Sequence, residues 1–192
     1  MSKGKLIVLS APSGTGKSTI INELMKDSTL GLSFSVSATS RRPREGEKDG
    51  VNYYFLTQEE FERRIAADEF VEWAEVYAGT YYGTLASEIE RITSSGRNVI
   101  MDIDVAGAEN VKKMYGSRAL TIFIEPPSLE VLKERLTGRG TDDADSIARR
   151  LGKAEYEMGF ASAYDREIVN DSLDKAVADV AEEIREFTRK EA

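Results

Sequence analysis

Residues 11–18 read A-P-S-G-T-G-K-S, which departs from the phosphate-binding pattern G-x-x-x-x-G-K-[ST] only at its first position. Gly14 and Gly16 allow a turn whose backbone N–H groups point into one concavity, and a following helix adds its partial positive charge. Lys17 can then reach the terminal phosphates of a nucleoside triphosphate, and the Ser18 hydroxyl can bind Mg²⁺. The alternative is a glycine-rich turn that holds a lysine by chance. The apolar run before the loop and the apolar stripe after it favour the phosphate site.

The first glycine of that pattern is replaced by Ala11. An alanine fits where the chain leaves a strand if its φ is negative, because its methyl group adds little bulk. We therefore expect the loop to keep its function. The residues predicted to contact the triphosphate are Ala11, Pro12, Ser13, Gly14, Thr15, Gly16, Lys17, Ser18 and Thr19.

The sequence R-R-P-R at residues 41–44 indicates a second anion site. The guanidinium groups of Arg41 and Arg44 can fork onto phosphate oxygens, and Tyr53 and Tyr82 can add hydroxyl donors. A solvated basic turn is the alternative. The presence of a phosphate loop in the same acidic chain favours the anion site.

Two carboxylates follow a buried apolar run. Asp102 ends the predicted strand 98–102, and ligands of α/β sheets lie at the carboxyl ends of the strands. A carboxylate at this point, opposite Ser18, is where a residue that organises Mg²⁺ belongs, directly or through water, and a cap on the next helix is the alternative. Asp104 lies two residues further on and on the same side of an extended chain, so it can face the same cleft.

The composition limits the chemistry and the partners. The chain has 192 residues, a net charge of −8, and no cysteine or histidine. Any chemistry must therefore use carboxylates, lysine, arginine, hydroxyls or the backbone, and the acidic balance argues against a nucleic-acid partner. The longest apolar run, residues 6–9, is too short to span a membrane, so we expect a cytoplasmic protein. The oligomeric state stays open.

Short apolar strands alternate with amphipathic stretches, which predicts a right-handed parallel α/β core. We expect residues 33–85 to form an insertion with a mixed character, and residues 79–84 to form a glycine-bounded loop within it. The predicted strands are 5–10, 34–40, 53–55, 70–76, 98–102, 119–125 and 168–169. The helices are predicted to begin near residues 18, 58, 85, 129, 142 and 173, with another between the strands 98–102 and 119–125.

Taken together, several motifs resemble those of guanylate kinases, the enzymes that phosphorylate GMP with ATP. They are A-P-S-G-T-G-K-S, S-V-S-A-T-S-R-R-P-R-E-G-E and M-D-I-D-V-A-G, with E-W-A, Y-Y-G-T, G-R-G-T and V-N-D, in order over nearly the whole chain. The resemblance implies a P-loop three-layer fold with a parallel sheet, an inserted GMP-binding subdomain and a short helical lid. It implies ATP and GMP as small-molecule substrates and Mg²⁺ as cofactor. The implied parts are core segments 1–32, 86–127 and 158–192, a GMP-binding insertion 33–85 and a lid region 128–157.

The same resemblance assigns roles to single residues. It implies that Glu72 and Asp104 accept hydrogen bonds from guanine, that Asp102 serves Mg²⁺ with Ser18, and that Ser37 and Thr84 lie near the guanine O6. It places Arg41, Arg44, Tyr53 and Tyr82 on the phosphate of GMP. Arg139 and Arg150 match lid arginines that, with Lys17 and Arg41, serve the transfer, and Asn170 matches a position beside the adenine of ATP. From the residues alone, Glu72 could equally be an exposed strand carboxylate, and Asn170 a helix cap or turn residue.

The expected reaction needs no general base, because the second pKa of a phosphate monoester is about 6. The absence of histidine is consistent with such a transfer. Two other functions are weighed. A phosphopeptide-binding module without catalysis has no physical reason to keep Gly14, Gly16, Lys17 and Asp102 together, and a kinase for a ribose phosphate has no need for Glu72 and Asp104.

Overall fold

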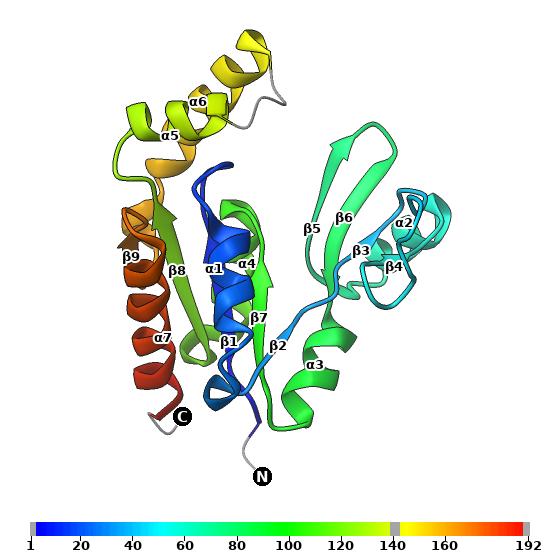
Figure 1. Ribbon diagram of the computed structural model, residues 1–192. Coiled ribbons are helices and arrows are strands. Elements are labelled where there is room, and N and C mark those ends of the chain that lie inside the picture. The colour runs from blue at the N-terminus through cyan, green and yellow to red at the C-terminus, as the bar shows by residue number, and fades with distance from the viewer. Residues whose placement is uncertain (1–2, 139–142, 190–192) are drawn as a thin grey trace.

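The computed structural model of the protein describes residues 3–138 and 143–189 (Figure 1). The strands are β1 Leu6–Ser10, β2 Leu32–Phe34, β3 Ala38–Thr39, β4 Tyr54–Phe55, β5 Phe70–Tyr77, β6 Thr80–Leu85, β7 Asn98–Asp102, β8 Ala119–Glu125 and β9 Arg166–Val169. The helices are α1 Lys17–Leu24, α2 Gln58–Ala66, α3 Ala86–Ser94, α4 Val105–Tyr115, α5 Leu129–Gly138, α6 Ala144–Met158 and α7 Leu173–Arg189. Short 3₁₀ turns lie at Ser28–Leu30, Gly116–Arg118 and Ala161–Ala163.

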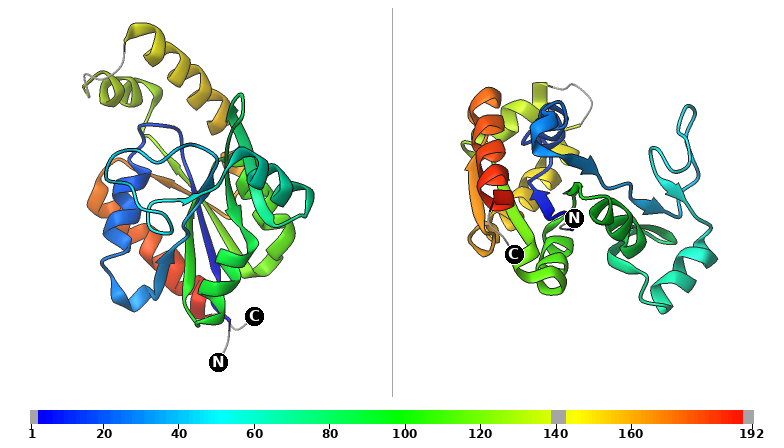
Figure 2. Two further views of the ribbon diagram at one scale, coloured as in Figure 1. Left: turned by 90° about the vertical axis from the view of Figure 1, so that its right-hand side faces the viewer. Right: turned by 90° about the horizontal axis from the view of Figure 1, so that it is seen from below.

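The core is a five-stranded sheet in the order β2-β7-β1-β8-β9, in which every neighbouring pair is parallel. All residues of the central strand β1 are buried, because helices cover both faces of the sheet (Figure 2). Ile7 and Leu9 belong to the apolar cluster of α1 and α7, whereas Leu6 and Val8 belong to that of α3 and α4. This arrangement confirms the expected α/β fold class.

The carboxyl edge of the core sheet gathers the polar segments. Strands β1 and β7 are adjacent, and their register pairs Leu9 with Asp102. The loop that follows β1 and the carboxylates at the end of β7 therefore emerge side by side. Their common position depends on a pairing between segments about ninety residues apart in sequence, as the parallel topology predicts.

A second sheet, in the order β4-β3-β6-β5, lies beside the core with an apolar cluster of its own. Phe61 of α2 stacks on Phe70 with ring centroids 4.3 Å apart. The single strand predicted over residues 34–40 was wrong. β2 ends in the core sheet and β3 begins the second sheet, and residues 35–37 connect the two. The local apolar pattern carries no information about which sheet each half joins.

The glycine-bounded loop predicted over residues 79–84 was also wrong, because this segment forms most of β6. It pairs antiparallel with β5, where Trp73 lies opposite Gly83. A Cβ atom on Gly83 would lie only 2.6 Å from the carbonyl oxygen of Glu72. The glycine therefore permits a close backbone approach within the sheet and does not interrupt the strand.

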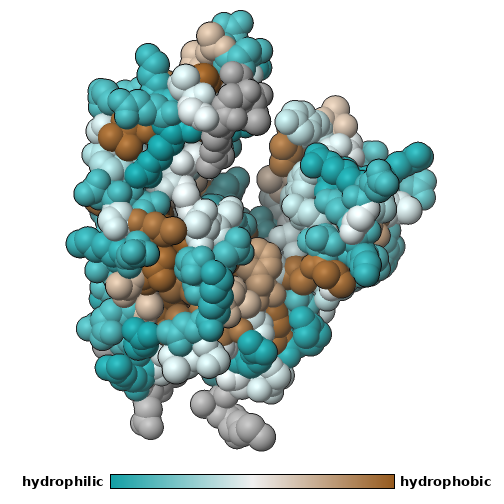
Figure 3. Space-filling model, in the orientation of Figure 1, coloured by the Kyte–Doolittle hydropathy of each residue, from teal (hydrophilic) through white to brown (hydrophobic). Residues whose placement is uncertain are grey.

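Helices α5 and α6 stand above the carboxyl edge of the core sheet and pack through a separate apolar cluster (Figure 1). Its buried members are Leu132, Leu136 and Ala154. The space-filling view shows a hollow between the second sheet on one side and the core with α5 and α6 on the other (Figure 3). No helix among the described residues is long and apolar enough to cross a membrane.

Candidate functional site

The loop between β1 and α1 has the backbone geometry of an anion cradle. Gly14 and Gly16 have φ angles of +97° and +101°, a region in which other residues are strained. Gly16 is the N-cap of α1 and no side chain caps this helix, so its first N–H groups remain for a ligand. Among residues 3–138 and 143–189, Asp68 is the single non-glycine residue with a positive φ. The φ of Ala11 is therefore negative, as an alanine at this point of the loop requires.

Asn170 supports this loop from behind. Its side-chain Nδ2 donates to the carbonyl oxygen of Thr15 at 2.7 Å, and Arg135 Nη2 donates to the carbonyl oxygen of Asn170 at 2.9 Å. Helix α7 begins only at Leu173, so Asn170 does not cap its first turn directly, and its side chain contacts the loop instead. Thr15 is fully buried, so its side chain is not available to a nucleotide.

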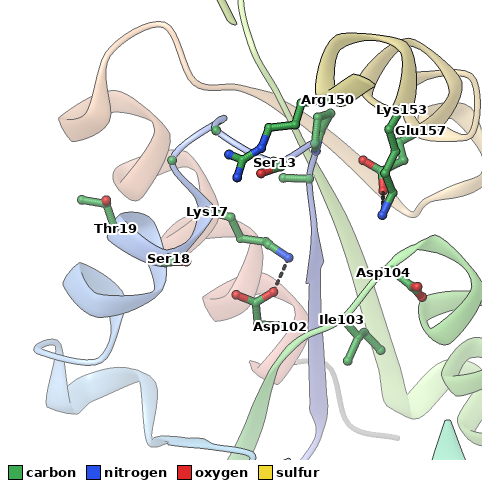
Figure 4. A pocket seen from close by; sticks show the side chains of 14 residues that line it. Ser13, Lys17, Ser18, Thr19, Asp102, Ile103, Asp104, Arg150, Lys153 and Glu157 are labelled. Carbon is green, nitrogen blue, oxygen red and sulfur yellow. Dashed lines mark hydrogen bonds and ion pairs between the residues drawn. The ribbon is translucent and has the colours of Figure 1, made fainter. Parts of the chain in front are cut away.

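A cavity of about 450 Å³ opens above the loop (Figure 4). Lys17 and Asp102 form an ion pair across it, and Arg150 extends from α6 toward Ser13. Lys153 and Glu157 reach down from the same helix, and sequence reasoning missed both. Their spacing from Arg150, three and seven residues along a helix, was the available signal. Arg139, the other predicted lid arginine, lies outside the described residues.

The donor set fits magnesium. Ser18 and Asp102 both line the cavity and offer hard oxygen ligands beside the loop. Within the described part of the chain, no group of three or more His, Cys, Asp or Glu residues could hold a metal ion by itself. Magnesium is commonly held by one or two protein oxygens together with phosphates and water, so this small set is sufficient.

The predicted acceptor-phosphate residues form a cluster on the second sheet. Arg41 Nε donates to the Tyr82 hydroxyl at 3.2 Å, and its guanidinium lies 5.4 Å from the centre of the Tyr53 ring. Its Nη1 and Nη2 each donate to Glu47 at 2.9 Å. Arg44 is exposed, and its backbone N–H donates to the same Glu47 at 2.7 Å.

Glu47 is therefore a site residue that the sequence analysis missed. The hydrogen bonds from Arg41, followed by the one from the backbone of Arg44, lower the pKa of the Glu47 carboxyl to about 2. Glu47 stays ionised at neutral pH and occupies one edge of the Arg41 guanidinium. The motif R-P-R-E-G-E contains two glutamates, and only the folded loop distinguishes the one that pairs with Arg41.

The predicted guanine readers meet at the N-terminus of α4. Glu72 Oε1 accepts a hydrogen bond from the Thr84 hydroxyl at 2.6 Å, while Asp104 Oδ1 accepts one from the Gly107 N–H at 2.9 Å. The cap that was the alternative for Asp102 is thus formed by Asp104. The only hydroxyl proton of Thr84 is donated to Glu72, whereas Ser37, the other predicted hydroxyl, is half-buried.

Ionisation of Glu72 is less favourable in the folded protein than in the unfolded chain. Burial raises the pKa of the Glu72 carboxyl above its ordinary value, the nearby charge of Asp104 raises it further, and the Thr84 hydroxyl offsets part of the rise. The ionised form of a partly buried carboxylate beside a second carboxylate is favoured when a ligand supplies N–H donors to both.

This pKa shift predicts a stability change in Glu72→Gln. The unfolded chain ionises this group near 4.5 and the folded chain only at higher pH, so ionisation destabilises the folded state at neutral pH. We expect Glu72→Gln to melt at a higher temperature than the parent at pH 7. The difference should close as the pH falls through the raised pKa toward 4.5. Thermal melts between pH 4 and pH 8 measure this, and a variant that is less stable at pH 7 would contradict it.

Comparison with known proteins identifies the family. The sequence model described as guanylate kinase matches residues 3–187. A guanylate kinase of Bacteroides thetaiotaomicron is 57% identical over 188 residues, which are 98% of this chain and 92% of that protein. The chain belongs to the guanylate kinase family. A second guanylate kinase, from Porphyromonas gingivalis, is 55% identical over 97% of this chain and 99% of its own length.

A solved structure agrees with this guanylate kinase membership. The crystal structure of guanylate kinase from Anaplasma phagocytophilum has a TM-score of 0.76 and 33% identity, and the match covers 99% of this chain and 89% of that one. These results confirm the interpretation of the chain as an enzyme, a guanylate kinase, over the phosphopeptide-binding module and the ribose phosphate kinase.

Proposed function

We propose that the hollow between the core and the second sheet holds ATP and GMP together, and that the γ-phosphoryl group of ATP passes there directly to the phosphate of GMP or dGMP. One observation carries this proposal. Asp104 lines the cavity above the phosphate loop, and a Cβ atom on Gly107 would lie within 3.4 Å of both Asp104 and Glu72. The donor cradle and the predicted guanine readers therefore share one cleft.

On the donor side, residues 11–19 bind the phosphates of ATP and Lys17 contacts the terminal ones. Lys17 is held by Asp102 in this structure, so a nucleotide has to draw the ammonium group away from that carboxylate. A second hollow of about 430 Å³ adjoins the loop and is lined by Arg135, Asn170 and Leu173 among others. We place the adenine of ATP in this hollow. Because Asn170 lines it, the hollow supports the predicted position of Asn170 beside the adenine.

Magnesium would be held by the Ser18 hydroxyl and the Asp102 carboxylate. When bound, it neutralises charge on the phosphates of ATP and on the migrating group. The release of Lys17 from Asp102 then serves two purposes, because it frees the ammonium for phosphate and the carboxylate for the ion.

On the acceptor side, Arg41 and Arg44 bind the phosphate of GMP with the hydroxyls of Tyr53 and Tyr82. Arg41 has five N–H donors, and four hydrogen bonds to Tyr82, Arg42 and Glu47 already use most of them. The phosphate therefore meets Arg41 by taking the remaining N–H or by displacing Glu47.

Guanine is distinguished from adenine by hydrogen-bond polarity. Guanine offers N1–H and N2–H₂ as donors, which Glu72 and Asp104 accept, and its O6 accepts from Ser37. Adenine presents a lone pair at N1 to a carboxylate, which leaves buried polar groups unpaired. Sites built in this way reject the wrong ligand by about 10⁴-fold or more.

The hydrogen bond from Thr84 to Glu72 gives this account a test. Thr84→Val keeps the shape of the side chain but removes the donor, so Glu72 loses the partner that fixes its carboxylate. A hydrogen bond to a charged group contributes about 1.5–3 kcal/mol, so the KM for GMP should rise at least about tenfold while the KM for ATP stays unchanged. Thr84→Ser keeps the donor and is the control. Steady-state kinetics measure the KM for GMP and the KM for ATP of each variant. An equal KM for GMP in Thr84→Val and Thr84→Ser would refute this role of Thr84.

The transfer requires positioning more than chemistry. An oxygen of the GMP phosphate attacks the γ-phosphorus of ATP as the bond to the oxygen of the leaving ADP breaks, and no general base is required. Lys17, Arg41 and Arg150 supply positive charge between two polyanions that repel each other. We assign Arg139 as the second arginine of the lid, beside Arg150, from its place in the motif G-R-G-T alone. Because ATP and GMP are cytoplasmic metabolites, we also propose a cytoplasmic location.

One assay tests the proposed function. ADP release from ATP is followed with GMP, dGMP, AMP and a ribose bisphosphate side by side, with and without magnesium. We expect turnover with GMP and dGMP, little with AMP or the ribose bisphosphate, and dependence on magnesium. Absence of turnover with GMP would overturn the proposal.

A further inference from the structure

Gly107, the third residue of α4, is buried where that helix approaches the second sheet. Its backbone has ordinary helical geometry, because its φ is not among the positive angles recorded for the described residues. Alanine is the better helix former at such a position. The backbone of α4 therefore gives no reason for a glycine here.

The space around Gly107 does give a reason. A Cβ atom on Gly107 would lie 3.2 Å from Cγ and 3.3 Å from Oε2 of Glu72, and 3.4 Å from Oδ1 of Asp104. Contacts of this kind normally lie near 3.5–4.0 Å, so a methyl group would push Glu72 away by a few tenths of an ångström.

Neither carboxylate can yield freely. Glu72 is tied through Oε1 to the buried hydroxyl of Thr84, and Asp104 is tied to the N–H of Gly107 itself. The two come from different parts of the fold, β5 and the β7–α4 junction, and both lie within 3.4 Å of the position that a Cβ atom on Gly107 would take. The missing side chain thus sets the separation between the two carboxylates.

We propose that Gly107 is a specificity-determining positioning residue for the acceptor base: its missing side chain lets Glu72 and Asp104 lie close enough to accept from N1–H and N2–H₂ of one guanine. The inference rests on the proposed function of these two carboxylates. Gly107 acts through these two carboxylates, and the proposal requires no direct contact between Gly107 and the base.

The test compares two helical Gly→Ala variants. Gly107→Ala adds the methyl group against Glu72, whereas Gly152→Ala in α6 adds one where no atom lies within 4 Å. We expect both variants to remain folded and to keep the KM for ATP. Gly107→Ala alone should raise the KM for GMP about tenfold, because small misplacements of a binding group are costly. It should also reduce the preference for GMP over IMP, which lacks the N2 amine.

A double-mutant cycle adds a second measurement. With Thr84→Val already present, Glu72 is free to move, so adding Gly107→Ala should cost less than it does in the parent. Fully additive effects would overturn the inference. A KM for GMP and a preference for GMP over IMP equal to those of Gly152→Ala would also overturn it. Lack of GMP turnover by the parent protein would instead overturn the proposed function, so the two failures are distinguishable.

Discussion

Lys17→Met should lower kcat for the ATP–GMP reaction by at least about 10²–10³-fold, the usual cost of removing one preorganised donor from a developing charge. Lys17 is the loop cation that faces both the cradle and Asp102, and no other lysine follows Gly16 at the start of α1. Methionine keeps the length and the apolar stem of the side chain. The loss should therefore appear in the transfer and leave the fold intact.

The control for this variant lies on the same segment. Lys26→Met removes an exposed lysine just beyond α1 that pairs only with Glu23 among the described residues. Single-turnover kinetics and thermal melts on both variants separate chemistry from stability. Turnover of Lys17→Met within tenfold of the parent would contradict the role assigned to Lys17.

Glu72→Gln should reduce kcat/KM for GMP by about 10³-fold or more and leave ATP binding unchanged. The amide replaces an acceptor with a donor that faces the N–H groups of guanine, so buried donors are left opposed and unpaired. Because Gln is nearly isosteric and lacks the costly charge of Glu72, this loss should accompany a gain in stability at pH 7. A functional loss together with a stability gain separates a binding role from a structural one.

Glu75→Gln is the matched control, since Glu75 lies on the same strand but is exposed, and its contact is the N–H of Gly79 in the following turn. Glu75→Gln should keep the kcat and the KM for GMP of the parent. If Glu72→Gln and Glu75→Gln gave the same kcat/KM for GMP, the assignment of Glu72 as a guanine reader would fail.

Local patterns were enough for much of the core. The phosphate loop, the strands β7 and β8 and the start of α2 at Gln58 depend on neighbouring residues, and the sequence predicted each of them. The subdivision at residues 33, 85 and 128 stays a prediction, as do the nucleotide contacts of single residues.

The second sheet was harder because its strands depend on partners distant in sequence. The local sequence Tyr-Tyr-Gly is typical of a turn. Gly83 is required in a strand only because β6 pairs with β5, where the two backbones approach closely. The same reason explains the missed side chains. Glu47, Arg135 and Glu157 are common surface residue types, and only the fold brings them to Arg41, Asn170 and the cavity above the loop.

The central claim is that one cleft holds a triphosphate on the loop after β1 and a guanine between Glu72 and Asp104. A crystal structure with GMP, magnesium and a non-hydrolysable ATP analogue tests it most directly. We predict that the guanine N1 and N2 lie within hydrogen-bond distance of Glu72 and Asp104, that the GMP phosphate lies on Arg41 and Arg44, and that Lys17 has left Asp102 for the analogue. GMP bound with its guanine edge away from both carboxylates would contradict the account.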